Sequence, residues 1–419
     1  MTTLIGTALR NYSHLKMDTI RASIQESVGS LRSRLRERHR GTLVQQATEV
    51  ARKGAALSIY CPINVALAHT AAPRLEAVAK PDSQSRILSR RPMTIVTVNS
   101  GFCAGKSTDP NLQTPNMVVS RLREMLLTLG DQWKSIGKNL KWVHAPTVFY
   151  PSKPIELARV DDRNPNSFKY IREAVLNYYF SYSTTINGVL ERGFSPLLVG
   201  GDHSLAFASV STVSNHYFRK TGKTAGLVWV DAHGDINTRA TSPSGNFHGG
   251  PVAALLGISN TVMDLFMEKP LNPRNIVYIA IRDLDPGEIA TIARLGIKVF
   301  SAKDIEKDGL ESVMQQARAI AGQGTSGICV SFDIDGVEGT HVPGTGTPVS
   351  VGENMDKRGL TPQEAKDMAT IFGSWRNLIS FDMVEVNPEI DQKPGFPTVQ
   401  LASEILTNFI VSRNDTSIT

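Results

Sequence analysis

The stretch Gly226-Leu227-Val228-Trp229-Val230-Asp231-Ala232-His233-Gly234-Asp235-Ile236-Asn237 joins an apolar run to a set of ionisable side chains. The run at 226–230 predicts a buried strand, because short continuous apolar runs are typical of strands that are covered on both faces. Asp231, His233 and Asp235 follow at every second position, and such residues of an extended chain point to the same side. Two carboxylates and an imidazole that are buried together need compensation. The stretch therefore predicts a cation site, with a solvated strand end as the alternative.

The chain from residue 93 onward repeats this alternation of strands and helices. Apolar strand patterns lie at 94–98, 140–143, 196–199, 226–230, 275–281, 297–300, 327–332 and 378–386. Helical patterns lie at 116–133, 167–192, 205–219, 310–321, 362–372 and 399–411. Nearly continuous apolar strands that alternate with helices indicate a parallel sheet covered on both faces. We therefore predict an α/β fold of three layers, α/β/α, around a mostly parallel central sheet.

Residues 1–92 differ from the remainder in charge. They hold 15 Lys and Arg against 6 Asp and Glu, a balance of +9, whereas the remainder holds 30 against 33, a balance of −3. Because the excess of basic residues belongs to this segment, the main body is not expected to bind nucleic acid. We predict a basic, helical N-terminal extension with a linker at 1–92, followed by a catalytic domain at 93–419.

The composition also bears on the compartment. Cys61, Cys103 and Cys329 lack the spacing of a disulfide framework or a zinc ribbon, which favours a reducing compartment and a cytoplasmic location. Mitochondrial import is the alternative, since transit peptides are rich in Arg and Ser, although the extension also fits a surface helix pair with a basic face. No membrane span is predicted: Pro62 interrupts the uncharged stretch at 54–72, whose hydrophobicity is modest.

Further ionisable side chains fall at the carboxyl ends of the predicted strands, where such sheets bind their ligands. His203 follows 196–199, Asp333 and Asp335 follow 327–332, and Glu385 lies near the end of 378–386. Together with the opening stretch, four aspartates and two histidines gather, which exceeds what one ion needs and suits two bridged ions.

The ligand types narrow the choice of ion. Oxygen ligands with some imidazole favour Mn²⁺, with cobalt, iron or zinc as alternatives. A water between two such ions has its pKa lowered to about 7 and supplies hydroxide at neutral pH. That is the nucleophile of a hydrolase.

Six motifs carry a resemblance to a known superfamily. They are Gly200-Gly201-Asp202-His203-Ser204, Asp231-Ala232-His233-Gly234-Asp235-Ile236-Asn237-Thr238, Ser244-Gly245-Asn246-Phe247-His248-Gly249, Ser331-Phe332-Asp333-Ile334-Asp335-Gly336, Pro343-Gly344-Thr345-Gly346-Thr347-Pro348 and Met383-Val384-Glu385-Val386-Asn387-Pro388. In this order they resemble the motifs of the ureohydrolases. Asn237 and the run at 242–248 resemble the arginase form, and the likeness covers roughly residues 93–412.

The resemblance implies a manganese hydrolase that cleaves L-arginine to L-ornithine and urea, by attack of a metal-bridging hydroxide on the guanidinium carbon. It implies one Mn²⁺ on His203, Asp231, Asp235 and Asp333, and a second on Asp231, His233, Asp333 and Asp335. It further implies a role in arginine metabolism and the urea cycle, and a homo-oligomer that is a trimer or a hexamer.

The resemblance also implies roles for the residues around the ions. Glu385 and Thr347 would meet the guanidinium, Asp335 would orient the hydroxide, and His248 would pass a proton to the departing amine. At the amino-acid end, the α-carboxylate would be bound by Asn237, Ser244 and Asn246, and the α-amino group by Asp285. Taken singly, His248 also fits a packed loop histidine, and Asp285, Ser244 and Asn246 fit turn residues.

Three departures from the family pattern bear on substrate choice. Glu338-Gly339 stands where Asp-Pro is usual, 350–358 has the character of an insertion, and 101–110 matches the family's glycine-rich loop poorly. Two alternatives remain: a sister guanidine or amidine hydrolase of the agmatinase kind, and a catalytically silent regulatory homologue. The six intact ligand positions argue against the second.

Overall fold

The computed structural model describes residues 93–97, 120–122, 124–125, 127, 141–144, 167–245, 247–351, 358–388, 390–391 and 393–414. The predicted extension at 1–92 and the poorly matching loop at 101–110 lie outside these residues, as does Asn246. The predicted domain boundary between residues 92 and 93 therefore stays a prediction.

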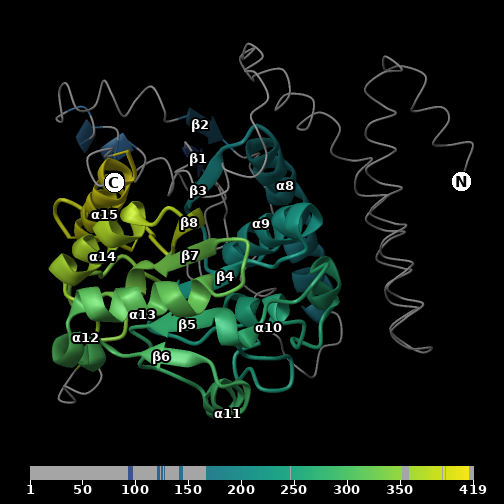
Figure 1. The fold of residues 1–419 in the computed structure, drawn as a ribbon. Helices are drawn as coiled ribbons and strands as arrows, with labels where there is room; N and C mark the ends of the chain where they lie inside the picture. Colours follow the sequence, from purple (N-terminus) through teal and green to yellow (C-terminus); the bar gives the residue numbers. More distant parts are fainter. Residues whose placement is uncertain are drawn as a thin grey trace, which may run out of the picture. The chain divides into compact units, whose positions relative to one another are not determined.

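One sheet organises the described part of the chain (Figure 1). Its order is β2-β1-β3-β8-β7-β4-β5-β6, and every pairing is parallel. The strands are β1 (Met93–Thr97), β2 (Lys141–His144), β3 (Ser195–Val199), β4 (Gly226–Val230), β5 (Ile276–Ile279), β6 (Lys298–Phe300), β7 (Ile328–Asp333) and β8 (Leu378–Val384). The prediction of a parallel sheet is confirmed, and each predicted strand lies within two residues of its observed bounds.

Helices cover both faces of this sheet. They are α8 (Ser167–Glu191), α9 (Leu205–Thr221), α10 (Pro251–Leu255), α11 (Pro286–Leu295), α12 (Ala302–Asp308), α13 (Leu310–Gly322), α14 (Pro362–Ser374) and α15 (Pro397–Asn414). Helices α8 and α9 lie on one side of the sheet, and α13, α14 and α15 lie on the other (Figure 1). The predicted three-layer α/β/α architecture is therefore confirmed.

Helix α11 was missed by the sequence analysis although its boundary signals are present. Asp285 is its N-cap, Pro286 occupies the first turn, and Gly296 ends the helix in the left-handed region at φ 64°. Pro is favoured at the first helical position and Gly just past the last. The short length of α11 left too few apolar repeats for the period to be recognised.

The two faces of β7 and β8 differ in polarity. Val330 and Phe332 join Phe381 and the side chains of α14 and α15 in one buried apolar cluster. The alternate positions carry Ser331 and Asp382, which are fully buried and face the α9 side, where Ser209 of α9 donates to Asp382. Buried polar groups on a strand are expected only where they are hydrogen-bonded.

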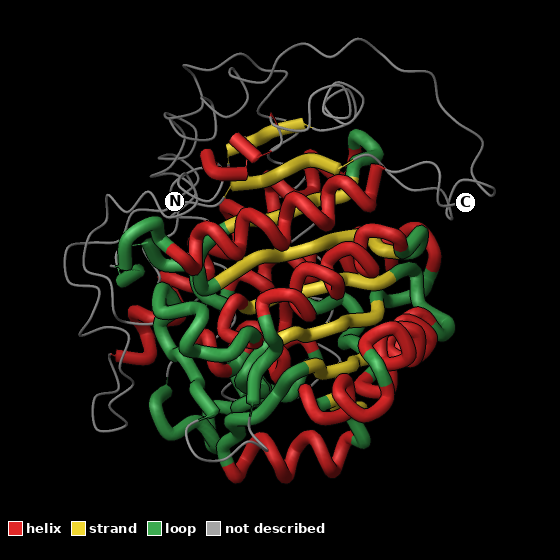
Figure 2. Tube along the Cα trace, turned by 90° about the vertical axis from the view of Figure 1, so that its left-hand side faces the viewer, coloured by secondary structure: helices red, strands yellow, loops and turns green. Residues whose placement is uncertain are grey.

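The parallel arrangement brings all carboxyl ends of the strands to one edge. Figure 2 shows the strands one above another, with long loops gathered at one end of them. Because β3, β8, β7 and β4 are neighbours at the centre, the loops that follow them lie together at this edge. None of the described helices is long and apolar enough to cross a membrane.

Gly226, the first residue of β4, offers a test of the packing between sheet and helix. A Cβ added there would overlap the backbone oxygen of Ala321 in α13. We expect Gly226→Ala to lower the free energy of unfolding by about 1–3 kcal/mol, the usual cost of overpacking. Denaturant titration measures this change.

Gly188 provides the matched control, because a Cβ added there in α8 would meet no atom within 4 Å. Gly188→Ala is expected to leave stability unchanged or raise it by about 0.5–1 kcal/mol. Equal effects of the two substitutions would contradict the packing described here.

Candidate metal centre and active site

The predicted ligands do meet at the carboxyl edge, but not for the reason that the sequence suggested. Strand β4 ends at Val230, and Asp235 has a left-handed φ of 48°, so Asp231, His233 and Asp235 do not lie along an extended chain. The prediction of an extended alternation is wrong. The loop is compact instead, and His233 N donates to Asp231 Oδ1 at 2.7 Å.

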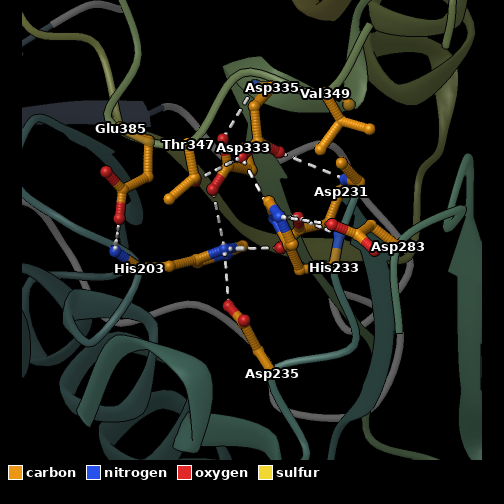
Figure 3. A network of polar contacts seen from close by, with 12 residues as sticks. His203, Asp231, His233, Asp235, Asp283, Asp333, Asp335, Thr347, Val349 and Glu385 are labelled. Carbon is orange, nitrogen blue, oxygen red and sulfur yellow. Dashed lines mark hydrogen bonds and ion pairs between the residues drawn. The ribbon is translucent and has the colours of Figure 1, made fainter. Parts of the chain in front are cut away.

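His203 lies at the centre of one group of ligands (Figure 3). Its Nδ1 is 2.9 Å from Asp231 Oδ2, 3.2 Å from Asp235 Oδ2 and 3.1 Å from Asp333 Oδ2. The ring stacks on Trp229 at a centroid distance of 3.8 Å and an angle of 9°. Two carboxylates from the loop after β4 and one from the last residue of β7 therefore point at one imidazole nitrogen.

His233 marks a second group that shares Asp231 with the first. Its Nδ1 lies 3.4 Å from Asp231 Oδ1 and 3.2 Å from Asp335 Oδ2. The side chain of His233 is 25% exposed whereas that of His203 is 1% exposed, so the second group is nearer to solvent. Each group, His203 with Asp231 and Asp235, and Asp231 with His233 and Asp335, has the geometry to hold a metal ion.

The charges of this cluster are unbalanced without a cation. Burial, followed by the negative charge of Asp231, raises the pKa of Asp235 to about 8. Burial and the charges of Asp335 and Asp231 likewise raise the pKa of Asp333 well above its ordinary value. Buried like charges disfavour their ionised forms unless a positive charge is present.

The donor atoms fit a divalent metal ion. The Nδ1 of His203 is buried and makes no well-oriented hydrogen bond within the described part of the chain, although three carboxylate oxygens surround it. A nitrogen lone pair with this environment is suited to a cation. Carboxylate oxygens and imidazole nitrogens are ligands of Mn²⁺, and also of related divalent ions.

Glu385 and His248 lie beside the first group. Glu385 Oε1 accepts from the backbone N–H of His203 at 2.9 Å and lies 3.7 Å from His248 Nδ1. Burial, then the charge of Asp202, raises the pKa of Glu385 well above its ordinary value. Burial, then the charges of His233 and His203, lowers the pKa of His248 to about 4. A buried carboxyl and a neutral histidine therefore face each other here.

Thr347 connects the loop at 343–348 to the second group. Its Oγ1 donates to Asp335 Oδ2 at 3.1 Å (Figure 3). The loop is held in turn by Gly344, whose N donates to Thr398 Oγ1 at 2.8 Å, at the start of α15. Thr347 is therefore brought to the predicted site.

The residues predicted for the amino-acid end are partly brought together. Asn237 Nδ2 donates to Asp285 Oδ2 at 2.7 Å, and Thr241 Oγ1 donates to Asn237 Oδ1 at 2.9 Å. Glu288 of α11 accepts from the backbone N–H groups of Ile236 and Asp285, at 3.1 and 3.0 Å, and so ties the two loops together. Ser244 is exposed in the following loop.

Arg282 is a structural member of the site that the sequence analysis missed. Its guanidinium donates to five backbone oxygens, those of Asp335 at 2.8 Å, Val337 at 3.0 Å, Val349 at 2.9 Å, and Ala280 and Gly336 at 3.3 Å each. The side chain thereby joins the loop after β5 to the loops that carry Asp335 and Thr347. The signal was weak, because an arginine that binds only main-chain oxygens leaves no partner in the sequence pattern.

Glu338 accounts for the departure at positions 338–339. Its Oε1 accepts from Val351 N and its Oε2 accepts from Gly359 N, each at 2.9 Å. The carboxylate thus accepts hydrogen bonds at both ends of the predicted insertion at 350–358. Residues 352–357 of this insertion lie outside the described residues. His341, which has no assigned role, is exposed in the same loop.

Comparisons with known proteins agree with this geometry. Residues 138–411 match the family model described as Arginase family. An arginase of Bacillus caldovelox is 36% identical over 222 residues, which is 52% of this chain and 70% of the relative. An arginase of Emericella nidulans is 34% identical over 268 residues, which is 62% of this chain and 78% of the relative.

Solved structures give the same result for the fold. The native Bacillus caldovelox arginase structure has a TM-score of 0.59 and 27% identity, and the match covers 76% of this chain and 98% of that one. The sheet and its edge of aspartates and histidines therefore define a hydrolase of the ureohydrolase superfamily. Within that superfamily, the chain belongs to the arginase family.

Arg282→Lys tests whether the planar guanidinium holds the ligand loops. An ammonium has three N–H donors and cannot bond all five of these oxygens, so we expect a loss of about 1–3 kcal/mol in the free energy of unfolding. Chemical denaturation provides the measurement. The control is Arg219→Lys, an exposed arginine paired with Glu268 at 2.7 Å, for which little change is expected. An Arg282→Lys variant with the same free energy of unfolding as the parent would refute this role.

Proposed function

We propose that the protein is a dinuclear manganese arginase that hydrolyses L-arginine to L-ornithine and urea. The observation that carries this proposal is the pair of ligand groups that share Asp231 at the carboxyl edge of an arginase-family sheet. Asp333 supports it, because its Oδ2 lies 3.1 Å from His203 Nδ1 of the first group, and its Oδ1 accepts from the backbone N–H of Asp335, a residue of the second group, at 2.8 Å.

Six side chains would hold the ions. The proposed ligands are His203, Asp231, His233, Asp235, Asp333 and Asp335, with Asp231 and Asp333 as bridges. A bound manganese pair supplies Lewis acidity and lowers the pKa of a water to about 7. Trp229 supports the ligand set, since its Nε1–H donates to Asp231 Oδ2 at 2.9 Å and fixes that carboxylate.

The guanidinium group of the substrate would contact Glu385, Thr347 and His248. The buried carboxyl of Glu385 suits a cationic guanidinium, whose N–H groups form charge-assisted hydrogen bonds with carboxylates. Asp335 orients the attacking water by accepting a hydrogen bond from it. The water would add to the guanidinium carbon and give up a proton, which His248 would take up; the bond to the substrate's side-chain nitrogen would then break, and His248 would pass the proton to that leaving nitrogen.

The amino-acid end is assigned to the loops around α11. The Asp285 carboxylate would pair with the α-amino group, and the Asn237 amide, already fixed by Asp285 and Thr241, would face the α-carboxylate. Ser244 and Asn246 complete the proposed carboxylate subsite. Because the guanidinium is common to all substrates of this class, these residues decide between arginine and analogues that lack the amino-acid end.

We also propose the organisation of the whole chain. Residues 93–419 would form the catalytic domain of a homo-oligomer, as the resemblance implies, and residues 1–92 a basic extension. The net charge of +9 carried by residues 1–92 supports either a cytoplasmic surface segment or a mitochondrial targeting segment.

Urea release from a panel of guanidines, with added Mn²⁺, tests the proposed function. We expect release from arginine and little from agmatine, which lacks the α-carboxylate and leaves buried polar groups unpaired. Asp333→Ala should release no urea and should bind less manganese, because it removes a proposed bridge. Equal turnover of agmatine and arginine would instead favour a guanidine hydrolase that does not read the amino-acid end.

His248→Asn tests the proton donor. We expect kcat to fall by about 10²–10⁴-fold, the usual contribution of a positioned acid or base, with manganese content unchanged. The control is His341→Asn, which changes an exposed histidine of the neighbouring loop and should retain the parent rate. If both variants turn over at the parent rate, His248 is only a packed loop residue.

A further inference from the structure

A row of buried polar side chains lies behind His203, on the side away from the proposed ions. His203 Nε2 is 2.9 Å from Ser331 Oγ on β7. Ser331 is the register partner of Asp382 on β8, and both are fully buried. Asp382 makes no contact with the proposed ions or substrate groups, and the mechanism above does not use it.

Asp382 is enclosed by hydroxyl groups. Ser209 of α9 donates to its Oδ2. Burial raises the pKa of the Asp382 carboxyl to about 7, and the side-chain hydrogen bonds of Ser209 and Ser331 lower it against this larger effect. The Oδ1 atom of Asp382 is buried and has no hydrogen-bond partner of good geometry in the described part of the chain. It is therefore available for the hydroxyl hydrogen of Ser331.

The direction of these hydrogen bonds follows from the chemistry of each group. A neutral imidazole that presents the Nδ1 lone pair to a cation must carry its hydrogen on Nε2. Ser331 Oγ must then accept from Nε2–H, and its own hydrogen must go to an acceptor. In its ionised form the Asp382 carboxylate only accepts hydrogen bonds, and this form therefore permits a single direction for the hydrogen bonds from His203 through Ser331.

We propose that Asp382 is a positioning residue of the metal centre, which acts through Ser331 to hold His203 in the tautomer whose Nδ1 lone pair faces Asp231, Asp235 and Asp333. The inference rests on the proposed metal site and is independent of the substrate. Histidine ligands commonly donate their second N–H to a carboxylate or a backbone oxygen, which fixes both tautomer and ring orientation. Here a serine hydroxyl stands between the two groups.

Asp382→Asn separates this role from simple packing. The amide has nearly the shape of the carboxyl, but its NH₂ group donates, so Ser331 can turn and donate to Nε2 instead. His203 would then carry its hydrogen on Nδ1, where it cannot serve as a ligand. Ser331→Ala removes the hydroxyl that stands between Asp382 and His203. This variant tests the proposal if Asp382→Asn fails to fold.

Ser380→Ala is the matched control. Ser380 lies two residues before Asp382 on the same strand, is equally buried, and pairs with Cys329 rather than with Ser331. It has no route to His203. The loss of one buried serine hydroxyl is thereby compared at two positions on the same face of the sheet.

The experiment titrates Mn²⁺ into the metal-free full-length protein and its variants, with the ions counted by chelator competition. We expect Asp382→Asn and Ser331→Ala each to weaken one of two ions by about 10–100-fold and to leave the other at parent affinity. The double variant should bind no more weakly than the weaker single variant, because both act through one chain of bonds. Ser380→Ala should bind as the parent does.

A second readout follows the tautomer itself. In protein with ¹⁵N-labelled histidine that is loaded with the diamagnetic ion Zn²⁺, His203 is expected to bind through Nδ1 and to carry its hydrogen on Nε2 in the parent, and to show an unbound fraction in Asp382→Asn. Parent affinity for both ions in a folded Asp382→Asn or Ser331→Ala variant would overturn the proposal, as would additive losses in the double variant. Urea release is scored separately, so that a parent that binds two ions but does not hydrolyse arginine refutes the proposed function alone.

Discussion

Repulsion among buried carboxylates governs the carboxyl edge of this sheet. Asp231, Asp235, Asp333 and Asp335 are each at most 5% exposed, and their oxygens converge on two histidines. Two unit charges 4 Å apart interact by about 4 kcal/mol at an effective dielectric constant of 20. Such a cluster needs positive charge at its centre, so binding of the proposed ions would contribute to the stability of the fold as well as to its chemistry.

Two residues of this edge have backbone conformations that residues other than glycine rarely adopt. Asp235 and Glu385 have left-handed φ values of 48° and 61°, each at a cost of about 1–3 kcal/mol. Hydrogen bonds fix both residues, since Val252 N donates to Asp235 O and Glu385 N donates to Gly201 O, each at 2.9 Å. Gly201 itself has φ 85°, which glycine adopts without strain. The strain therefore lies at one proposed ligand and at the proposed guanidinium acceptor.

The sequence predicted the sheet well because buried parallel strands are apolar throughout, and β4 has the bounds that its apolar run indicates. It predicted which ionisable side chains gather at the carboxyl edge through their chemical type and their position after strands, but it gave the wrong local geometry for Asp231, His233 and Asp235. Left-handed turns such as that at Asp235 leave no mark in a pattern of alternation. Arg282 and Trp229 were missed for another reason: their hydrogen bonds join main-chain oxygens and a carboxylate, and residue spacing does not encode such contacts.

The two ends of the proposed active site are built differently, and this difference has a consequence for specificity. The proposed metal ligands lie at the carboxyl ends of the central strands β3, β4 and β7. Ser331 of β7 and Asp382 of β8 form a buried polar layer within the sheet. The amino-acid end is made of loops joined by side-chain bonds such as Asn237 to Asp285, and Glu338 pins the insertion at the same edge. A change in a loop residue can alter which substrate is accepted while the sheet keeps the ligands in place. We therefore expect the departures from the family pattern at 338–339 and 350–358 to bear on the choice of substrate, and the proposed chemistry at the guanidinium carbon to depend on the strands.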